Sequence, residues 1–279
     1  MKKLLLTLLA SVVLNAHADT NDVGVMTFNI RCGSCEKTTD VNHWSRRQLL
    51  VEDLIRHDHP DLIGLQEAEL FQVRDLKAAL DEYGAIAVGR DDGKEQGEAT
   101  AIFYRKARFE LIEEATYWLS PTPETVSVGW DAALKRTVTM AKLKDRLSGQ
   151  VLVMLNTHFD HRGRVAQTES TRMLVKLAAS FAGKIPVIVT GDFNYTKTFP
   201  AYSIIATSLH DAEQVSLSPA QGGDMSFQGF GTAIEPGNKI DFVFVNDHVD
   251  VLSHAIVKTM YDGLYPSDHF PVEAKVRLK

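Results

Sequence analysis

The chain has 279 residues, of which 30 are Lys or Arg and 36 are Asp or Glu, so its formal net charge is −6. This acidic balance argues against a protein that binds duplex nucleic acid through a broad basic face. It does not exclude a nuclease whose metal ion supplies the local positive charge. The length suffices for one large α/β domain with a substantial core. The sequence has no linker, low-complexity tract or short repeat that would divide it.

Residues 1–18 have the pattern of a secretory signal peptide. Lys2 and Lys3 precede an apolar stretch over Leu4–Leu14 that is too short to span a membrane, and Ala16-His17-Ala18 is an A-x-A cleavage site. Cleavage after Ala18 would leave a single domain over residues 19–279, with 28 basic and 36 acidic residues and a net charge of −8. We therefore expect a secreted or periplasmic protein that is soluble, monomeric and not inserted stably in a membrane.

Apolar periodicity predicts helices and strands that alternate early, with strands dominating later. The predicted elements are strand 23–30, helix 46–57, strand 61–66, helix 69–80, strands 83–89, 99–105, 109–119, 138–144 and 151–156, helix 167–182, and strands 185–190, 240–245, 249–258 and 271–278. Ser45 is the expected N-cap of the first helix. This order predicts an α/β domain with two mixed β-sheets packed face to face and helices outside.

The two cysteines, Cys32 and Cys35, follow the first predicted strand with C-x-x-C spacing. Two thiols cannot complete a structural zinc site. In an exported protein this pair favours a disulfide that tightens the loop, and the alternative is a thioredoxin-like redox motif.

Four short motifs place polar side chains where strands are predicted to end: Thr27–Ile30, Gln66-Glu67, Gly191–Asn194 and Ser267–His269. Each offers hard oxygen ligands or a titratable ring. Such a set suits a site that holds a divalent cation against a phosphate while a base activates water. Structural alternatives exist for single residues, for example a helix-start charge for Glu67, but the four motifs together favour the site.

In these residues and their order, the chain resembles the endonuclease/exonuclease/phosphatase superfamily. That group includes deoxyribonuclease I, exonuclease III-type repair nucleases, inositol polyphosphate 5-phosphatases, bacterial sphingomyelinases and nocturnin-type deadenylases. The resemblance extends from Asn29 to His269. It implies a four-layer α/β sandwich and metal-dependent hydrolysis of phosphoesters, and it is poorly specific for the substrate.

The resemblance assigns metal-binding roles to three residues. Asn29 and Glu67 match the metal-site pair of the family, with Glu67 as the direct ligand of Mg²⁺ or Mn²⁺. Asp268 is expected to reach this metal or a second one. Arg31 stands where some repair nucleases carry an aspartate, which weakens the case for a repair nuclease.

The remaining matches are catalytic or contact the substrate. His158 matches a catalytic histidine, Glu98 the acid that orients it, and Asp241 the aspartate that orients His269. Asp192 and Asn194 match the pair near the attacking water and the transition state, and either Asp192 or His269 is the base.

Two further residues near these motifs are candidates for substrate contact. Arg136 resembles a phosphate-clamping arginine, with an exposed strand arginine as the alternative. His161 either contacts the substrate or supports its neighbours. Five basic residues could form a rim for an anionic substrate, but most of them are expected to be solvated surface charge: Arg46, Arg47, Arg162, Arg164 and Lys239.

The expected function is metal-assisted, in-line attack of water on a phosphodiester, with a nucleic acid or nucleotide as the favoured substrate. A lipid, sugar or inositol phosphate is the alternative. A non-catalytic binding module would require a broken site, and each core position of the motif set is present.

Overall fold

The computed structural model describes residues 22–183 and 185–279, so the signal peptide expected over residues 1–18 lies outside the described part. The strands are β1 (Asp22–Asn29), β2 (Leu62–Glu69), β3 (Tyr83–Ile86), β4 (Glu98–Arg105), β5 (Phe109–Trp118), β6 (Thr137–Asp145), β7 (Val151–His158), β8 (Val187–Asp192), β9 (His210–Asp211), β10 (Asp241–Val245), β11 (Val249–Ile256) and β12 (Val272–Leu278). The helices are α1 (Trp44–Asp58), α2 (Leu70–Ala79), α3 (Arg164–Ala182), α4 (Pro200–Ala206), α5 (Ala212–Val215) and the short 3-10 helix η1 (Gly229–Gly231).

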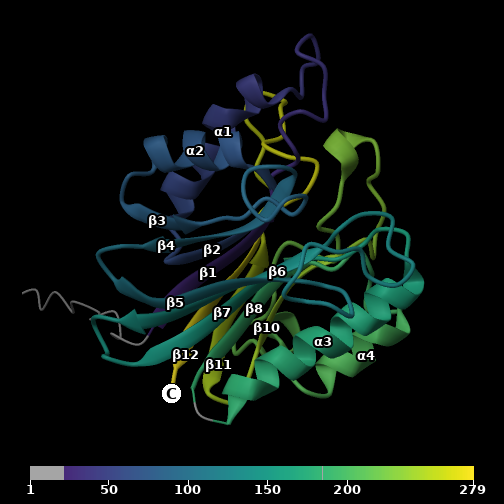
Figure 1. The fold of residues 1–279 in the computed structure, drawn as a ribbon. Coiled ribbons are helices and arrows are strands. Elements are labelled where there is room, and N and C mark those ends of the chain that lie inside the picture. Colours follow the sequence, from purple (N-terminus) through teal and green to yellow (C-terminus); the bar gives the residue numbers. More distant parts are fainter. Residues whose placement is uncertain (1–21, 184) are drawn as a thin grey trace, which may run out of the picture.

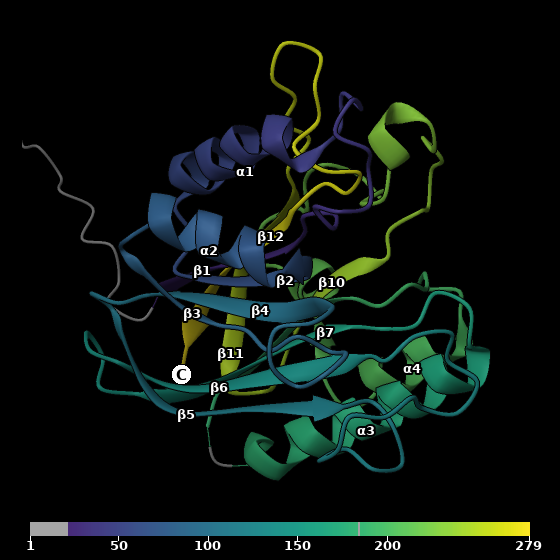
Figure 2. The same cartoon turned by 45° about the horizontal axis from the view of Figure 1, so that its top comes forward.

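Two six-stranded mixed sheets form the centre of the molecule, with strand orders β11-β12-β1-β2-β4-β3 and β5-β6-β7-β8-β10-β9. They pack face to face, with α1 and α2 outside the first sheet and α3 and α4 outside the second (Figures 1 and 2). The predicted four-layer α/β sandwich is thus confirmed. Among the described residues, none of the helices combines the length and apolar character needed to cross a bilayer.

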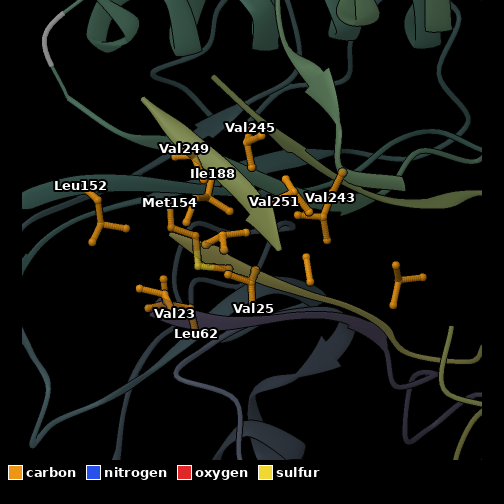
Figure 3. Close-up of a cluster of buried hydrophobic side chains, with 14 of the residues drawn as sticks. Val23, Val25, Leu62, Leu152, Met154, Ile188, Val243, Val245, Val249 and Val251 are labelled. Atoms are coloured by element: carbon orange, nitrogen blue, oxygen red, sulfur yellow. The ribbon is translucent and has the colours of Figure 1, made fainter. Parts of the chain in front are cut away.

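Strand alternation explains how the same strands build both the core and a polar edge. Successive side chains of a strand point to opposite faces, so one parity faces the opposing sheet and the other faces the helices. Along β1, Val23 and Val25 join the core between the sheets, whereas Met26 and Phe28 pack with residues of α1 and α2. Figure 3 shows Val23 and Val25 within this inter-sheet cluster. Continuing the inward parity of β1 leads to Asn29 at its end.

The interior between the sheets changes from apolar to polar toward one end of the sandwich. There, Gln66 donates hydrogen bonds to Thr27 and Asn156, at 2.9 and 2.7 Å. The Asn156 amide in turn donates to the Leu65 carbonyl across the inter-sheet space, at 2.8 Å. Buried polar groups that are mutually hydrogen-bonded fix the relative position of the two sheets.

The first helix begins at Trp44, two residues before its predicted start at Arg46. His43, not Ser45, is the N-cap of α1, and its side chain accepts a hydrogen bond from the Ser45 backbone N–H. The predicted cap was wrong because an imidazole nitrogen accepts the capping hydrogen bond, which a hydroxyl or carboxylate oxygen usually accepts. The helices α4 and α5 were not predicted, since segments of seven and four residues are too short to show helical periodicity.

Candidate active site

The ends of strands from both sheets bring most of the predicted site residues to one cleft of about 530 Å³. β1 is parallel to β2 and β7 is parallel to β8, so their carboxyl ends lie at the same edge of each sheet. The first residue of the antiparallel β10 joins this edge because Asp241 pairs with Asp192. The predicted residues that line the cleft are Glu67, Glu98, Arg136, His158, His161, Asp192, Asn194, Asp268 and His269.

Glu67 and Asp268 form the acidic side of the cleft. Glu67 lies at a bulge of β2 and has a positive φ of 57°, an unusual conformation for a non-glycine residue. Its carboxylate accepts hydrogen bonds from the Asn29 amide at 3.1 Å and from the Cys32 N–H at 3.2 Å. The Arg31 guanidinium lies 3.7 Å from Glu67 and 3.8 Å from Asp268. Two carboxylates therefore share one cationic group.

The chemistry of this acidic side fits a divalent cation. Burial raises the pKa of Asp268, and the negative charge of Glu67 adds to this effect while His269 opposes it. Burial also opposes ionisation of Glu67, but the positive charges of His269 and Arg31 outweigh it and lower the pKa of Glu67. Oxygen atoms of buried carboxylates that lack full compensation are the ligands that hard cations such as Mg²⁺ take.

Asn29 lies behind the acidic side and contacts two carboxylates. Its amide nitrogen donates to Glu67 and, at 2.9 Å, to Asp192, while its amide oxygen accepts the Arg31 N–H at 3.0 Å. In this arrangement the buried amide nitrogen of Asn29 orients the two carboxylates.

His269 and Asp241 form a buried pair at the centre of the site. The His269 ring nitrogen Nδ1 lies 2.8 Å from Asp241 Oδ2, and Nε2 lies 3.8 Å from Asp192 Oδ2. Burial alone would lower the pKa of His269, but the negative charges of Asp241 and Asp192 raise it to about 10. Burial, reinforced by the charge of Asp241, raises the pKa of Asp192 to about 7. The three groups form a proton-sharing set in which a carboxylate fixes the histidine tautomer.

The opposite side of the cleft carries donors. Arg136 contacts Nδ1 of His158 at 2.9 Å and Nδ1 of His161 at 3.1 Å. Glu98, expected to orient His158, lies 3.8 Å from that Nδ1 atom and is held by Arg90 in two hydrogen bonds of 2.5 and 2.8 Å. Arg136 and Glu98 therefore both approach Nδ1 of His158, and Arg136 makes the shorter contact.

Asn194 completes the floor of the cleft. Its φ is 52°, and its backbone N–H donates to Asp192 at 2.9 Å while its amide nitrogen donates to the Phe159 carbonyl at 2.9 Å. The amide group is thereby fixed two residues beyond the end of β8.

Two arginines have site roles that the sequence analysis missed. Arg31 was noted only as a departure from the repair nucleases, yet it bridges Glu67 and Asp268 and also pairs with Glu36 at 2.9 Å. Arg90 fixes Glu98, and its only sequence signal is a place before a glycine-rich loop.

Three of the five basic residues, Arg46, Arg162 and Arg164, are exposed, as expected for most of that set, and two are buried. Arg47 is 1% exposed and donates to backbone carbonyls, and Lys239 is 3% exposed and pairs with Glu213. These two are the exceptions to the surface interpretation, because each finds carbonyl or anionic partners in other segments of the chain.

Cys32 and Cys35 form the expected disulfide at the rim of the same cleft. Cys32 is buried, Cys35 is exposed, and the Cys32 N–H contact described above joins this loop to Glu67.

The comparisons with known proteins agree with this geometry. The chain matches the Endonuclease/Exonuclease/phosphatase family over residues 26–269. It is 38% identical to an endonuclease/exonuclease/phosphatase from Bacteroides vulgatus, with a TM-score of 0.87 over 92% of this chain and 99% of that one. It is 32% identical to a mannosyl-6-phosphatase from Bacteroides thetaiotaomicron, with a TM-score of 0.86 over 91% of this chain and 99% of that one.

Among curated proteins, it is 25% identical to nocturnin from Drosophila melanogaster over 214 residues, which are 70% of this chain and 32% of the fly protein. The chain thus spans about a third of the length of that relative. The family match covers nearly all of the described residues and includes both the acidic side and the histidine pair. The chain therefore belongs to the endonuclease/exonuclease/phosphatase family.

Proposed function

We propose that this protein is a divalent-metal-dependent phosphoesterase that cleaves a phosphate ester with water. One observation carries the proposal: the Glu67–Asp268 acidic side faces the Arg136–His158 donor side, and Asp192 and His269 lie between them. A phosphoryl group needs charge neutralisation and a positioned water more than a covalent intermediate. The acidic side and the donor side serve charge neutralisation, and Asp192 and His269 lie between them to position the water.

In this proposal Glu67 and Asp268 would hold Mg²⁺ or Mn²⁺, which supplies Lewis-acid neutralisation of the phosphate charge. Asn29 keeps the Glu67 and Asp192 carboxylates in place through its amide nitrogen. Asp192 accepts the proton of the attacking water, and the His269–Asp241 pair lies beside it.

On the donor side, His158 and Asn194 donate hydrogen bonds to the phosphoryl oxygens while the ester oxygen departs. Arg136 holds His158 and adds positive charge near the phosphate.

For the substrate, we propose a phosphorylated molecule of sugar size. The cleft volume of about 530 Å³ is within the roughly 300–1,000 Å³ that is usual for small-molecule sites. The net charge of −6 argues against a large basic footprint, and the mannosyl-6-phosphatase is similar over nearly the full length of both chains. Export of the protein, inferred from residues 1–18, would place this activity outside the cytoplasm.

A nucleotide or nucleic acid phosphodiester, favoured by the sequence analysis, is the second candidate. His161, linked to Arg136 at 3.1 Å, extends the row of donors beyond His158. A longer row of hydrogen-bond donors suits a phosphodiester, in which the phosphate carries a group on each side.

The test measures phosphate or product release by the protein in Mg²⁺ and in EDTA. The substrates are hexose 6-phosphates, inositol phosphates, short nucleotides, RNA, plasmid DNA and sphingomyelin. We expect metal-dependent release from hexose phosphates that disappears in His269→Ala and persists in His57→Ala, a surface histidine whose side chain is 84% exposed.

If only nucleic acids were cleaved, a phosphodiester would replace the sugar phosphate as the substrate class. Turnover that survives both EDTA and His269→Ala would overturn the proposed mechanism.

A further inference from the structure

The disulfide loop brings two sulfur atoms next to the acidic side of the cleft. Sγ of Cys32, Sγ of Cys35 and a carboxylate oxygen of Glu67 all lie within 4.8 Å of one another. Cys35 is exposed, so a reductant can reach the disulfide from solvent. Two thiolates and a carboxylate are a donor set of a different kind from the hard oxygen ligands proposed for Mg²⁺.

The loop is held in place by bonds that do not involve the disulfide. The Gly33 N–H donates to the Gln72 side chain at 2.8 Å, and the Ser34 N–H and hydroxyl donate to the Glu69 carboxylate at 2.7 and 2.8 Å. Gly33 is also closely packed, since a Cβ atom there would lie 2.4 Å from the Phe71 ring. Cleavage of the S–S bond therefore leaves the backbone of Cys32 and Cys35 anchored on α2 and its N-cap.

The sulfur chemistry of this loop suits a thiophilic cation. Zn²⁺ binds Cys sulfur at about 2.3 Å and carboxylate oxygen at about 2.0–2.2 Å, commonly through two cysteines spaced C-x-x-C. Three protein ligands leave the fourth tetrahedral position for water, which overcomes the limit of two thiols alone. Side-chain rotation of the exposed Cys35 can adjust the separation of the sulfurs.

We propose that reduction of the Cys32–Cys35 disulfide creates a binding site for a thiophilic divalent cation such as Zn²⁺ or Cd²⁺, with both cysteines and Glu67 as ligands. With a phosphine as reductant, the S–S bond breaks, the phosphine is oxidised to its oxide with oxygen from water, and the two sulfurs take up the two protons of that water. Binding of the cation then releases both thiol protons to solvent.

A functional consequence rests on the proposed function. Because Glu67 serves both sites, a cation held by the reduced loop removes a ligand from the catalytic metal. The reduced protein is therefore inhibited by thiophilic cations, whereas the oxidised protein is not.

The first experiment measures cation binding without any substrate. Full-length protein, oxidised or reduced with a phosphine, is titrated with Cd²⁺ while the ultraviolet sulfur-to-cadmium charge-transfer band is recorded. We expect a band that saturates at a single Cd²⁺ per chain in the reduced protein, displacement by Zn²⁺, and no band in the oxidised protein. The oxidised wild type is a control that needs no mutation, and circular dichroism verifies that the reduced protein is folded.

Variants identify the ligands. Cys32→Ser/Cys35→Ser is expected to abolish the band, and Glu67→Gln is expected to weaken Cd²⁺ binding about tenfold or more while the band itself remains. The matched control is Glu36→Gln, because Glu36 is a neighbouring carboxylate that pairs with Arg31 and is not in the donor set. No band in the reduced protein, or equal affinity in wild type and Glu67→Gln, would overturn the proposed site.

The second experiment measures turnover in Mg²⁺ with stoichiometric Cd²⁺ or Zn²⁺. Loss of activity in the reduced protein only, restored by a chelator and fresh Mg²⁺, supports the shared ligand. Full activity in a reduced protein that shows the Cd²⁺ band would overturn the inhibition. Failure of the proposed function would appear differently, as absence of turnover in the oxidised protein, and the binding experiment would still decide the site.

Discussion

Arg136 donates a hydrogen bond to Nδ1 of His158 at 2.9 Å, and this contact determines which nitrogen of the histidine carries its proton. A guanidinium can only donate, so Nδ1 is the acceptor and the proton is on Nε2, which faces Asp192 at 3.4 Å. Burial lowers the pKa of His158 well below its ordinary value, and the positive charges of Arg136 and Arg90 lower it further. His158 is thereby a neutral hydrogen-bond donor at physiological pH.

Replacing this arginine tests that relationship. In Arg136→Met the lost positive charge lets the pKa of His158 rise, so His158 becomes protonated at a higher pH than in wild type. The low-pH limb of the activity profile should therefore shift to higher pH. We expect turnover to fall about 10- to 100-fold at neutral pH, as for other residues that orient a functional histidine. The measurement is the pH profile of kcat/KM, with Lys135→Met as the matched neighbour, since Lys135 pairs with Asp91 at 3.4 Å. An unshifted acidic limb in Arg136→Met would contradict the assigned tautomer.

The Asp241–His269 pair predicts a second loss of activity. Asp241→Asn keeps the size of the side chain but replaces the carboxylate that fixes the histidine tautomer at 2.8 Å. We expect kcat to fall by about 10²–10⁴-fold, the usual contribution of a positioned proton-transfer group. Because both residues act on one proton, Asp241→Asn/His269→Ala should be little worse than His269→Ala alone. Additive losses would show that the two residues act separately.

Gly64 predicts a packing effect between the sheets. A Cβ atom at Gly64 would lie 2.2 Å from the Thr190 hydroxyl and 2.5 Å from the Asn156 side chain, within the polar network that joins the sheets. Gly64→Ala should therefore destabilise the fold by about 1–3 kcal/mol through overpacking. Gly24→Ala is the matched control, since a Cβ there meets its nearest neighbours at 3.5 Å. Urea unfolding of the two variants compares them, and equal midpoints would refute the overpacking argument.

The stability of the fold is predicted to fall at low pH because of the charged cluster around Glu213. Burial opposes ionisation of this carboxyl, but Lys239 and Lys197 outweigh it and lower its pKa from 4.5 to about 2. The folded state thus favours the ionised form more than the unfolded chain does. The resulting stability is fully present above about pH 4.5 and is lost as the pH falls toward about 2.

Glu213→Gln should therefore lose less stability than wild type when urea unfolding is compared between about pH 5 and about pH 3. The matched control is Glu235→Gln, because Glu235 is exposed and should leave the acid dependence of wild type unchanged. The same pH dependence in Glu213→Gln and wild type would exclude the Lys239–Glu213 pair as its source.

The strand ends were predictable because period-two alternation and local motifs act within a few residues. The inward parity of β7 leads from Leu152 and Met154 through Asn156 to His158, so the change from core to site can be followed in the sequence alone. Contacts between distant segments could not be predicted in the same way. Arg136 lies beside His158 because β6 pairs with β7 in one sheet, whereas Glu98 approaches the same histidine from β4 of the opposing sheet.

Buried cations were the least predictable residues. Lys and Arg are mostly exposed, so sequence reasoning favours the surface wherever no partner is visible nearby. For Arg47 the decisive partner is the Pro266 carbonyl, 219 residues away in the chain.

Arg47 joins two chain segments that lie next to the acidic side of the site. Its guanidinium donates to the backbone carbonyls of Ile30 and Pro266 at 2.7 and 2.8 Å, and to that of Arg31 at 3.2 Å. The first segment follows Asn29 and the second precedes Ser267 and Asp268. A single buried side chain thus sets the separation of these two segments.

Arg47→Met keeps much of the apolar stem but removes the donor to the buried Ile30 and Pro266 carbonyls, while the Arg31 carbonyl keeps a hydrogen bond from Gln72. An unpaired buried group costs about 1–3 kcal/mol, so we expect a loss of stability of at least that size in urea unfolding. Arg46→Met, at the exposed neighbouring position, should change stability by less than about 0.5 kcal/mol. Because Arg47 joins the segment of Arg31, which contacts Glu67, to the segment before Asp268, the folded variant should also need more Mg²⁺ for half-maximal activity. A purely structural role would lower stability and leave the Mg²⁺ requirement of the folded fraction as in wild type, so the Mg²⁺ titration separates the two.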